Sequence, residues 1–173
     1  MIWRRILRAI QLDATLYEEV EADKGATVEA LIVVVLSSLA AGIGISSTVG
    51  GVGFIGGAIA TLVSWMVWAG VILLIGTKLL PEPETHSDMG ELLRTVGFSS
   101  SPGLFRVFGI FHPTLNMLLS IASNLWMLAA MVLAVKHALD YRSTARAAGV
   151  VAIGWLLQVA VLGGIYALLL AYS

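Results

Sequence analysis

Long apolar runs that contain almost no charge divide most of the chain into segments. Four are plain, over residues 26–45, 54–80, 115–135 and 147–171. Glu29, near the start of the first run, and Lys78, near the end of the second, are their only charged residues. A helix needs about 20 mostly apolar residues to cross a bilayer. Each run therefore predicts a membrane-spanning helix, and the second is long enough to be tilted.

The first 24 residues have a different pattern. Apolar residues recur at helical spacing on one face, whereas Arg4, Arg5 and Arg8 lie elsewhere. This predicts a short amphipathic helix over residues 1–24, followed by a membrane domain over residues 25–173. Two placements stay open: the helix lies in the membrane interface with its arginines at anionic headgroups, or it packs on the protein's own cytoplasmic face.

Residues 92–111 are ambiguous by hydropathy because they include Arg94 and Arg106. Asp88 and Glu91, three residues apart, predict a capped helix start. If the segment crosses, nine of the ten Lys and Arg residues share one side and Arg106 lies within the span. If it does not, a basic cluster moves outside, against the positive-inside rule. We therefore expect an all-α integral membrane bundle of five spans in the cell membrane, with the N-terminus cytoplasmic and the C-terminus outside. The predicted spans are residues 26–45, 54–80, 92–111, 115–135 and 147–171.

The third of these segments is unusual in its chemistry. Pro102 lacks a backbone donor and predicts a kink, and lipid cannot satisfy the carbonyls that a kink frees. We expect Ser99, Ser100 and Ser101 to satisfy them locally, or neighbouring helices to cover the break. Arg106 is costly in hydrocarbon and is predicted to face the bundle or reach an interface. The third span is therefore predicted to be surrounded by the others.

Composition excludes several classes of protein. The chain is 58% hydrophobic and only 12% charged, whereas soluble domains are about a quarter charged. A net charge of −1 gives no electrostatic footprint for nucleic acid, and the absence of cysteine removes thiol chemistry. His86, His112 and His137 fall in different segments on two sides of the membrane and cannot form one metal site. No nucleophile, base and orienting group converge, so we expect no enzymatic activity and no cofactor or metal.

Small residues have the spacing of close helix packing. Residues 51–56 match the G-x-G-x-x-G nucleotide pattern by letter, but no strand precedes them. Gly53 with Gly57, and Ala40 with Gly44, form small-xxx-small pairs. The sequence therefore predicts an external turn that leads into a glycine-lined helix.

Polar residues also follow one face of the fourth span. Asn116, Ser120 and Asn124 recur every four residues. They could line a polar path or meet Arg106, or they could make ordinary interhelical hydrogen bonds. We favour the hydrogen-bonding interpretation, because no carboxylate lies mid-membrane to move protons or cations.

Acidic residues gather in two groups on the predicted cytoplasmic side, and neither group has a calcium-loop spacing. A solvated acidic face is the favoured interpretation. The first group defines a candidate cytoplasmic interaction face, made of Tyr17, Glu18, Glu19, Glu21 and Asp23.

The order of these features resembles a known family. Residues 16–20 read Leu-Tyr-Glu-Glu-Val ahead of five spans, and residues 92–98 read Leu-Leu-Arg-Thr-Val-Gly-Phe, followed by three serines and Pro102. The chain resembles the Yip family of Ypt/Rab-interacting membrane proteins, specifically its prokaryotic branch. Its Gly97-Phe98-x-x-x-Pro102 element looks like a glycine–aromatic–proline stretch in the third span of eukaryotic members.

The resemblance implies a five-helix bundle with a cytosolic N-terminus and action through partners rather than catalysis. The chain lacks the long cytosolic N-terminal domain of eukaryotic members, so Rab binding is not carried over. Short loops and high Ala, Val and Gly content fit a bacterial plasma membrane protein.

Three functions follow as hypotheses. The first is a non-enzymatic scaffold or adaptor that engages membrane lipids, a protein partner or a second copy of itself. The others are a small transporter or channel component that uses the kinked third span, and an accessory subunit of a larger complex. The candidate functional centre consists of Gly97, Phe98, Pro102, Arg106, Asn116, Ser120 and Asn124.

Overall fold

The computed structural model describes residues 2–44 and 51–171, and in this part of the chain every regular element is a helix. The elements are α1 (Ile2–Ile10), α2 (Ala14–Ala22), α3 (Ala26–Gly44), α4 (Gly51–Leu74), the π-helical η1 (Ile75–Leu79), α5 (Met89–Phe98), the 3₁₀ helix η2 (Ser101–Phe111), α6 (Pro113–Ala138) and α7 (Thr144–Ala171). The predicted all-α class is confirmed. The turn expected over residues 46–50 and the C-terminal residues 172–173 lie outside the described residues, as do the surroundings of Gly44, Gly53 and Gly57.

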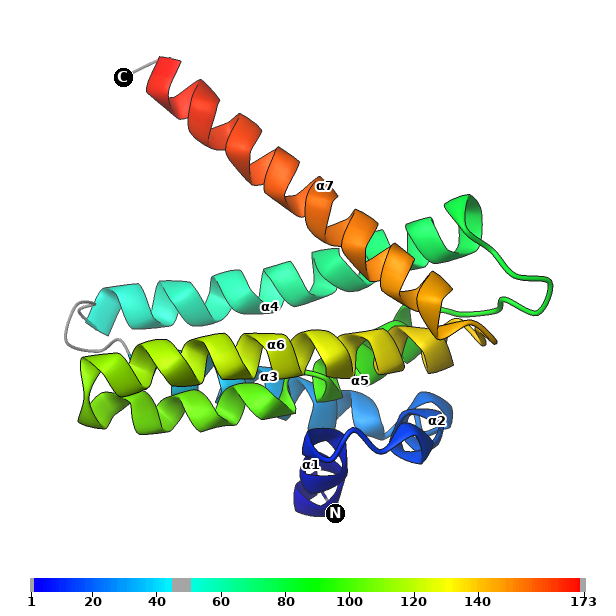
Figure 1. Ribbon diagram of the computed structural model, residues 1–173, viewed down its shortest axis with the longest axis horizontal. Coiled ribbons are helices and arrows are strands. Elements are labelled where there is room, and N and C mark those ends of the chain that lie inside the picture. Colours follow the sequence, from blue (N-terminus) through cyan, green and yellow to red (C-terminus); the bar gives the residue numbers. More distant parts are fainter. Residues whose placement is uncertain (1, 45–50, 172–173) are drawn as a thin grey trace.

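The long helices lie side by side and reverse direction from one to the next (Figure 1). Four are long and apolar enough to cross a membrane, with windows at Ala26–Ile43, Thr61–Leu79, Pro113–Ala138 and Thr144–Val161. These windows fall on the four plain apolar runs of the sequence. α7 leaves the bundle at an angle, and α1 and α2 lie together near the start of α3, at what we call the α2 end.

The ambiguous third segment is a broken helix that runs the length of the bundle. α5 and η2 together pack against α3, with which they run parallel, and against the antiparallel α6 (Figure 1). Because α5 is short and a turn separates it from η2, neither part alone has the length of a spanning helix. Five spans therefore stay a prediction.

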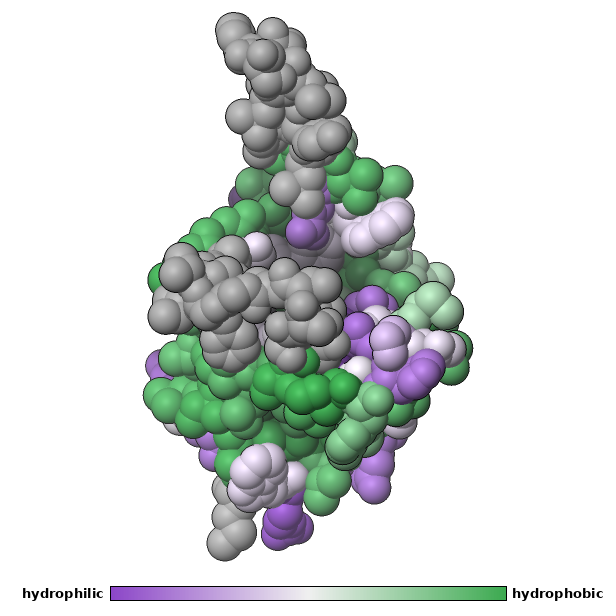
Figure 2. Space-filling model, turned by 90° about the vertical axis from the view of Figure 1, so that its left-hand side faces the viewer, coloured by the Kyte–Doolittle hydropathy of each residue, from purple (hydrophilic) through white to green (hydrophobic). Residues whose placement is uncertain are grey.

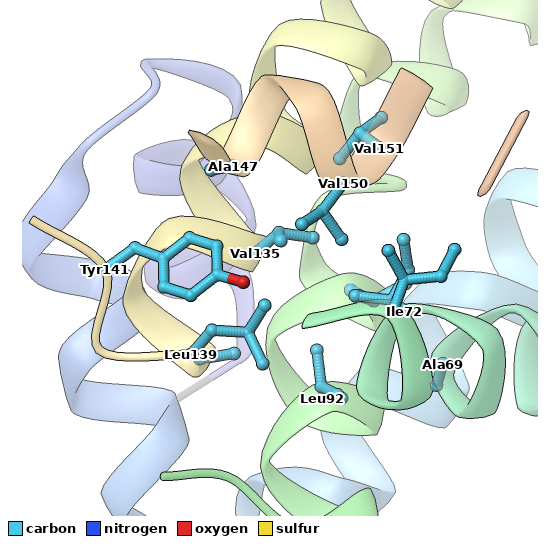
Figure 3. Close-up of a cluster of buried hydrophobic side chains, with 12 residues drawn as sticks. Ala69, Ile72, Leu92, Val135, Leu139, Tyr141, Ala147, Val150 and Val151 are labelled. Atoms are coloured by element: carbon cyan, nitrogen blue, oxygen red, sulfur yellow. The ribbon is translucent and has the colours of Figure 1, made fainter. Parts of the chain in front are cut away.

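Two hydrophobic clusters lie toward the α2 end. In the first, Ile72 of α4, Leu92 of α5, Val135 of α6 and Val150 of α7 meet in one buried group (Figure 3). In the second, apolar side chains of α1 and α2 pack on α3 and around Phe98, which is fully buried. Figure 2, seen from the end where α6 begins, shows hydrophobic side chains over much of the coloured surface. Such a surface suits contact with lipid tails.

The N-terminal segment forms two helices rather than the one amphipathic helix that the sequence pattern predicts. Leu12 has a φ of 58°, and this left-handed residue turns the chain between α1 and α2. Asp13 then caps α2, because its side chain accepts a hydrogen bond from the Thr15 backbone N–H. The two helices also differ in surroundings: Trp3 and Leu7 of α1 are exposed, whereas Leu16 and Val20 of α2 are fully buried.

Candidate functional site

The arginines of α1 bind the chain's own carboxylates. Arg5 donates to Glu19 at 2.9 Å, to Asp23 at 2.8 Å and to Glu29 at 2.8 Å. Arg8 pairs with Asp13 at 2.7 Å and also with Glu19. These bonds tie α1 to α2 and α3, and the hydrogen bonds from Arg8 hold the pKa of Asp13 and of Glu19 below the ordinary range. Arg5 and Arg8 therefore pack on the protein's own carboxylates, whereas Trp3 and Leu7 of α1 stay exposed, and contact of α1 with the membrane interface stays a prediction.

A buried arginine fastens α2 to the bundle. The Arg94 side chain, only 6% exposed, reaches the last turn of α2. Its Nε lies 2.9 Å from the Val20 carbonyl oxygen, and its guanidinium also donates to the Glu21 carbonyl. A cation at a helix C-terminus satisfies carbonyls that lack helical partners and opposes the negative end of the helix dipole. The charge pattern of the sequence identifies Arg94 only as a basic residue near a membrane boundary and gives no sign of this role.

An aromatic contact completes the docking of α2. Tyr17 is fully buried and stacks on His137 of α6 with ring centroids 6.5 Å apart. The Nδ1 atom of His137 lies 3.3 Å from a carboxylate oxygen of Glu18. Tyr17, expected on an accessible interaction face, is therefore a packing residue.

A wide open cleft lies beside α2. It has a volume of about 840 Å³ and is bordered by α2, the first turn of α5 with the segment before it, and the end of α6 with the loop that follows. We call it the acidic cleft. Its lining residues are Glu18, Glu21, Ala22, Glu84, Glu91, Lys136, His137, Asp140, Tyr141 and Arg142.

Charge is unbalanced in the acidic cleft, where five carboxylates face two Lys or Arg side chains. Burial, together with the nearby carboxylates of Asp140 and Glu91, raises the pKa of Glu21 to about 7. Repulsion among like charges of this kind is relieved when a cationic group enters. Among the described residues, no group of three metal-ligating side chains could hold a metal ion.

The predicted interaction face is thus divided by α2. Glu18 and Glu21 line the acidic cleft, whereas Glu19 and Asp23 belong to the Arg5 network. The sequence did not indicate that Asp140 belongs to the cleft. Its position there depends on a turn after α6, in which Asp140 has a φ of 52°.

Tyr141 orders one wall of the acidic cleft. Its hydroxyl lies 2.9 Å from the Gly76 carbonyl oxygen and 2.7 Å from that of Leu80, at the π-helical end of α4. No pattern in the sequence pointed to this pair of bonds.

Two serines bond to backbone carbonyls at the break in the third segment, which is one of the two arrangements that the sequence left open. In an α-helix, the backbone N–H of residue 102 would bond to the Phe98 carbonyl, but Pro102 has none. The Ser101 hydroxyl donates to that carbonyl instead, at 2.7 Å, and the Ser99 hydroxyl donates to the Val96 carbonyl at 2.7 Å. The chain then continues as η2 with Pro102 in its first turn.

Glycines bring this segment close to its neighbours. A Cβ atom built at Gly97 would lie 2.7 Å from the Ala30 Cβ of α3. One built at Gly103 would lie 2.0 Å from the Ser37 hydroxyl oxygen, and one at Gly109 would lie 2.9 Å from the Asn116 Cα. These distances are shorter than carbon and oxygen atoms tolerate, so the close approach depends on glycine.

The candidate functional centre therefore falls into two groups. Gly97, Phe98 and Pro102 lie at the helix break. Farther along, Arg106 donates to the side-chain oxygen of Asn124 on α6. Ser120 and Asn116, the other residues of the α6 stripe, belong to this second group. The Ser120 hydroxyl lies 3.5 Å from the side-chain oxygen of Asn116, and Asn116 also packs on Gly109.

A comparison with protein families places the chain. The Yip1 domain model matches residues 14–166. The chain belongs to the Yip1 family. The match begins at the first residue of α2 and extends into α7, so the docked α2, the helix break and Arg106 all lie within the Yip1 domain.

The family resemblance predicted from the sequence is confirmed, and this Yip1 protein is a multi-pass integral membrane protein. Its assignment to the prokaryotic branch stays a prediction. No curated protein and no solved structure is similar enough to match.

Proposed function

We propose that this Yip1-family protein is a non-enzymatic membrane adaptor that holds a basic segment of a partner protein in the acidic cleft. The observation that carries the proposal is the cleft itself: about 840 Å³ of open space with five carboxylates against two basic side chains. A lysine or arginine of a partner would relieve the repulsion around Glu21. Complementary charge of this kind steers encounter and gives specificity.

The cleft walls are preorganised, which favours binding. α2 is held by the buried Arg94 and by Leu16 and Val20, and the opposite wall is held by Tyr141. A partner that enters such a cleft does not have to order the walls first.

The proposed orientation puts the acidic cleft in the cytoplasm and includes five spans. α5 and η2 together measure roughly 37 Å at 1.5 Å per α-helical and 2.0 Å per 3₁₀ residue, enough for a hydrocarbon core of about 30 Å. Nine of the ten Lys and Arg residues fall at the α2 end or in adjoining turns, which supports a cytoplasmic side there. The cell membrane, and a bacterial one in particular, is proposed as the location.

Binding of a basic probe tests the proposal directly. The full-length protein in nanodiscs of zwitterionic lipid is titrated with a ten-residue lysine peptide, and with a glutamate peptide for comparison. The variant Glu21→Gln/Asp140→Asn removes two cleft carboxylates, and Glu19→Gln/Asp23→Asn removes two from the other side of α2. We expect salt-sensitive binding of the lysine peptide that the first variant weakens at least tenfold and the control variant preserves. Equal binding by both variants would refute the cleft as the docking site.

A photo-crosslinking amino acid then identifies the natural partner in intact membranes. Ala22 is exposed at the cleft, and Lys24 is exposed nearby outside it. The adaptor proposal expects one discrete adduct from position 22 that the Glu21→Gln/Asp140→Asn variant loses, and none from position 24. Adducts of equal yield from both positions would instead favour the broad contact of an accessory subunit in a larger complex.

A further inference from the structure

Arg106 has no ion-pair partner in the part of the chain that the structure describes. The carboxylates of the chain fall within residues 13–29 and 82–91 and at Asp140, so none lies on η2 or on the facing parts of α3, α4 and α6. The ion pairs within the described residues involve Arg5, Arg8, His137, Arg142 and Arg146, and not Arg106. An arginine inside a membrane bundle normally pairs with an acid, a backbone carbonyl or a water-filled cavity.

The guanidinium is only partly satisfied by the protein. One terminal nitrogen donates to the side-chain oxygen of Asn124 and lies 3.5 Å from the sulfur of Met127. The Nε atom is buried and has no hydrogen-bond partner among the described residues. A buried N–H without an acceptor is unfavourable, so this site is incomplete without a further acceptor.

A cavity of about 150 Å³ lies against Arg106 and provides room for such an acceptor. Its wall carries hydroxyl groups from two helices and from the helix break, at Ser37 and Ser38 of α3, Thr61 of α4 and Ser100. A water molecule takes up roughly 30 Å³, so the cavity has room for a group about the size of five water molecules. Arg106 and the hydroxyls together make a polar, cationic pocket inside an otherwise apolar bundle.

We propose that this Arg106 cavity binds the phosphate group of an anionic ligand. Guanidinium groups bind phosphate oxygens through parallel, charge-assisted hydrogen bonds, and the Nε–H with a second N–H presents that arrangement. The Ser38 hydroxyl donates to the Val34 carbonyl oxygen at 2.7 Å, and the Ser37 and Ser100 hydroxyls can donate to the remaining phosphate oxygens. The phosphate comes either from a phospholipid headgroup or from free inorganic phosphate, and both have the same chemistry at this site.

Two binding measurements distinguish the sources. In the first, the full-length protein is extracted from phosphatidylglycerol nanodiscs into detergent, and native mass spectrometry counts the phospholipids it retains. In the second, protein stripped of lipid in detergent is titrated with radiolabelled inorganic phosphate by equilibrium dialysis. We expect one phosphate-bearing ligand per chain in at least one measurement, and the measurement that detects it identifies the source.

Three variants assign the binding to this cavity. Arg106→Gln removes the charge but keeps a group that can bond to Asn124. Ala41 of α3 also lines the cavity, so Ala41→Leu fills it while Arg106 stays in place. Arg146→Gln removes an exposed arginine at the α2 end as a matched control. Binding should fall at least tenfold in both cavity variants and stay unchanged in the control. The proposal would be overturned if phosphate bound in neither measurement, or if the Ala41→Leu variant bound as tightly as the wild type. None of these changes touches the acidic cleft, so either result leaves the adaptor proposal standing.

Discussion

Replacement of Gly97 by alanine adds one methyl group where α5 lies against Ala30 of α3. The new Cβ would lie 2.7 Å from the Ala30 Cβ and 3.3 Å from both the Cα and the carbonyl oxygen of Ala30. Backbone atoms form part of this contact, so no rotation of a side chain can relieve it. The two helices must move apart where Phe98 is fully buried.

The magnitude follows from two opposing effects. Overpacking of a well-packed interior destabilises by about 1–3 kcal/mol. Alanine also favours a helix over glycine by about 1 kcal/mol, which offsets part of that loss. We therefore expect Gly97→Ala to lower the free energy of unfolding by up to about 2 kcal/mol.

A second substitution, at Ala30, tests whether this contact is the cause of the lost stability. Ala30→Gly alone should destabilise by about 1 kcal/mol because glycine is a poor helix former. In combination with Gly97→Ala it removes the atom in the 2.7 Å contact, so the double variant should return close to wild-type stability. The two effects should then fail to add by about 2 kcal/mol, within the range seen for residues in direct contact.

Unfolding in detergent, followed by fluorescence of the five tryptophans, measures these differences. Gly149→Ala is the matched control, since a Cβ at that helical position would meet nothing within 4 Å. It should be neutral or slightly stabilising. If Gly97→Ala behaves like Gly149→Ala, or if Ala30→Gly does not rescue it, the close contact between α3 and α5 is not what glycine provides.

Three further predictions concern other parts of the protein. Arg94→Met should destabilise the protein by about 2–4 kcal/mol, because it removes charge-assisted hydrogen bonds to two carbonyls at the end of α2. It should also speed proteolysis after α2, and an unchanged rate of proteolysis would argue against Arg94 as the anchor of α2. Since the pKa of Glu21 is raised to about 7, the folded state binds more protons than the unfolded state between about pH 4.5 and 7, so this residue makes stability fall as pH rises through that window. Glu21→Gln should flatten the decline in a pH series of melting curves, and an unchanged slope would contradict the assignment. In this cysteine-free chain, single Thr114→Cys and Ser143→Cys variants should react with impermeant thiol reagents from opposite sides of the membrane, and labelling from the same side would exclude five spans.

Features that depend on local chemistry could be predicted from the sequence. The four apolar helices follow from uninterrupted hydropathy, because lipid-facing helices must be apolar along their length. The Pro102 break and its serine hydrogen bonds follow from the missing N–H and from hydroxyls next to it. The polar stripe of α6 allowed a contact with Arg106 but did not require it. Whether Asn124 meets Arg106 depends on which face of α6 packs against the third segment, and the sequence does not contain that information.

Features that depend on distant backbone could not be predicted in the same way. Arg94 bonds to carbonyls 73 residues away, and hydropathy and charge counts contain no information about where the end of α2 will lie. Tyr17 illustrates the converse error. It stands next to acidic residues in the sequence, but its ring points into the bundle and stacks on His137. A short helix that turns one face to the protein and another to water cannot be resolved from composition alone.

The third segment contains a three-residue repeat, which is missed when the segment is treated as an α-helix. A 3₁₀ helix has three residues per turn, so residues three apart lie on one face. Gly103, Arg106 and Gly109 have that spacing, and all three contact α6, where they meet Met127, Asn124 and Asn116 in turn; Gly103 also lies against Ser37 of α3. The aromatic residues Phe105, Phe108 and Phe111 also recur every three residues, and the last two are 52% and 77% exposed on the outer surface. In an α-helix, with 3.6 residues per turn, these two sets would drift around the axis and Gly109 would leave the α6 face. The three-residue period therefore keeps Arg106 between two glycines against α6, and it also lengthens the segment by about 0.5 Å per residue relative to an α-helix.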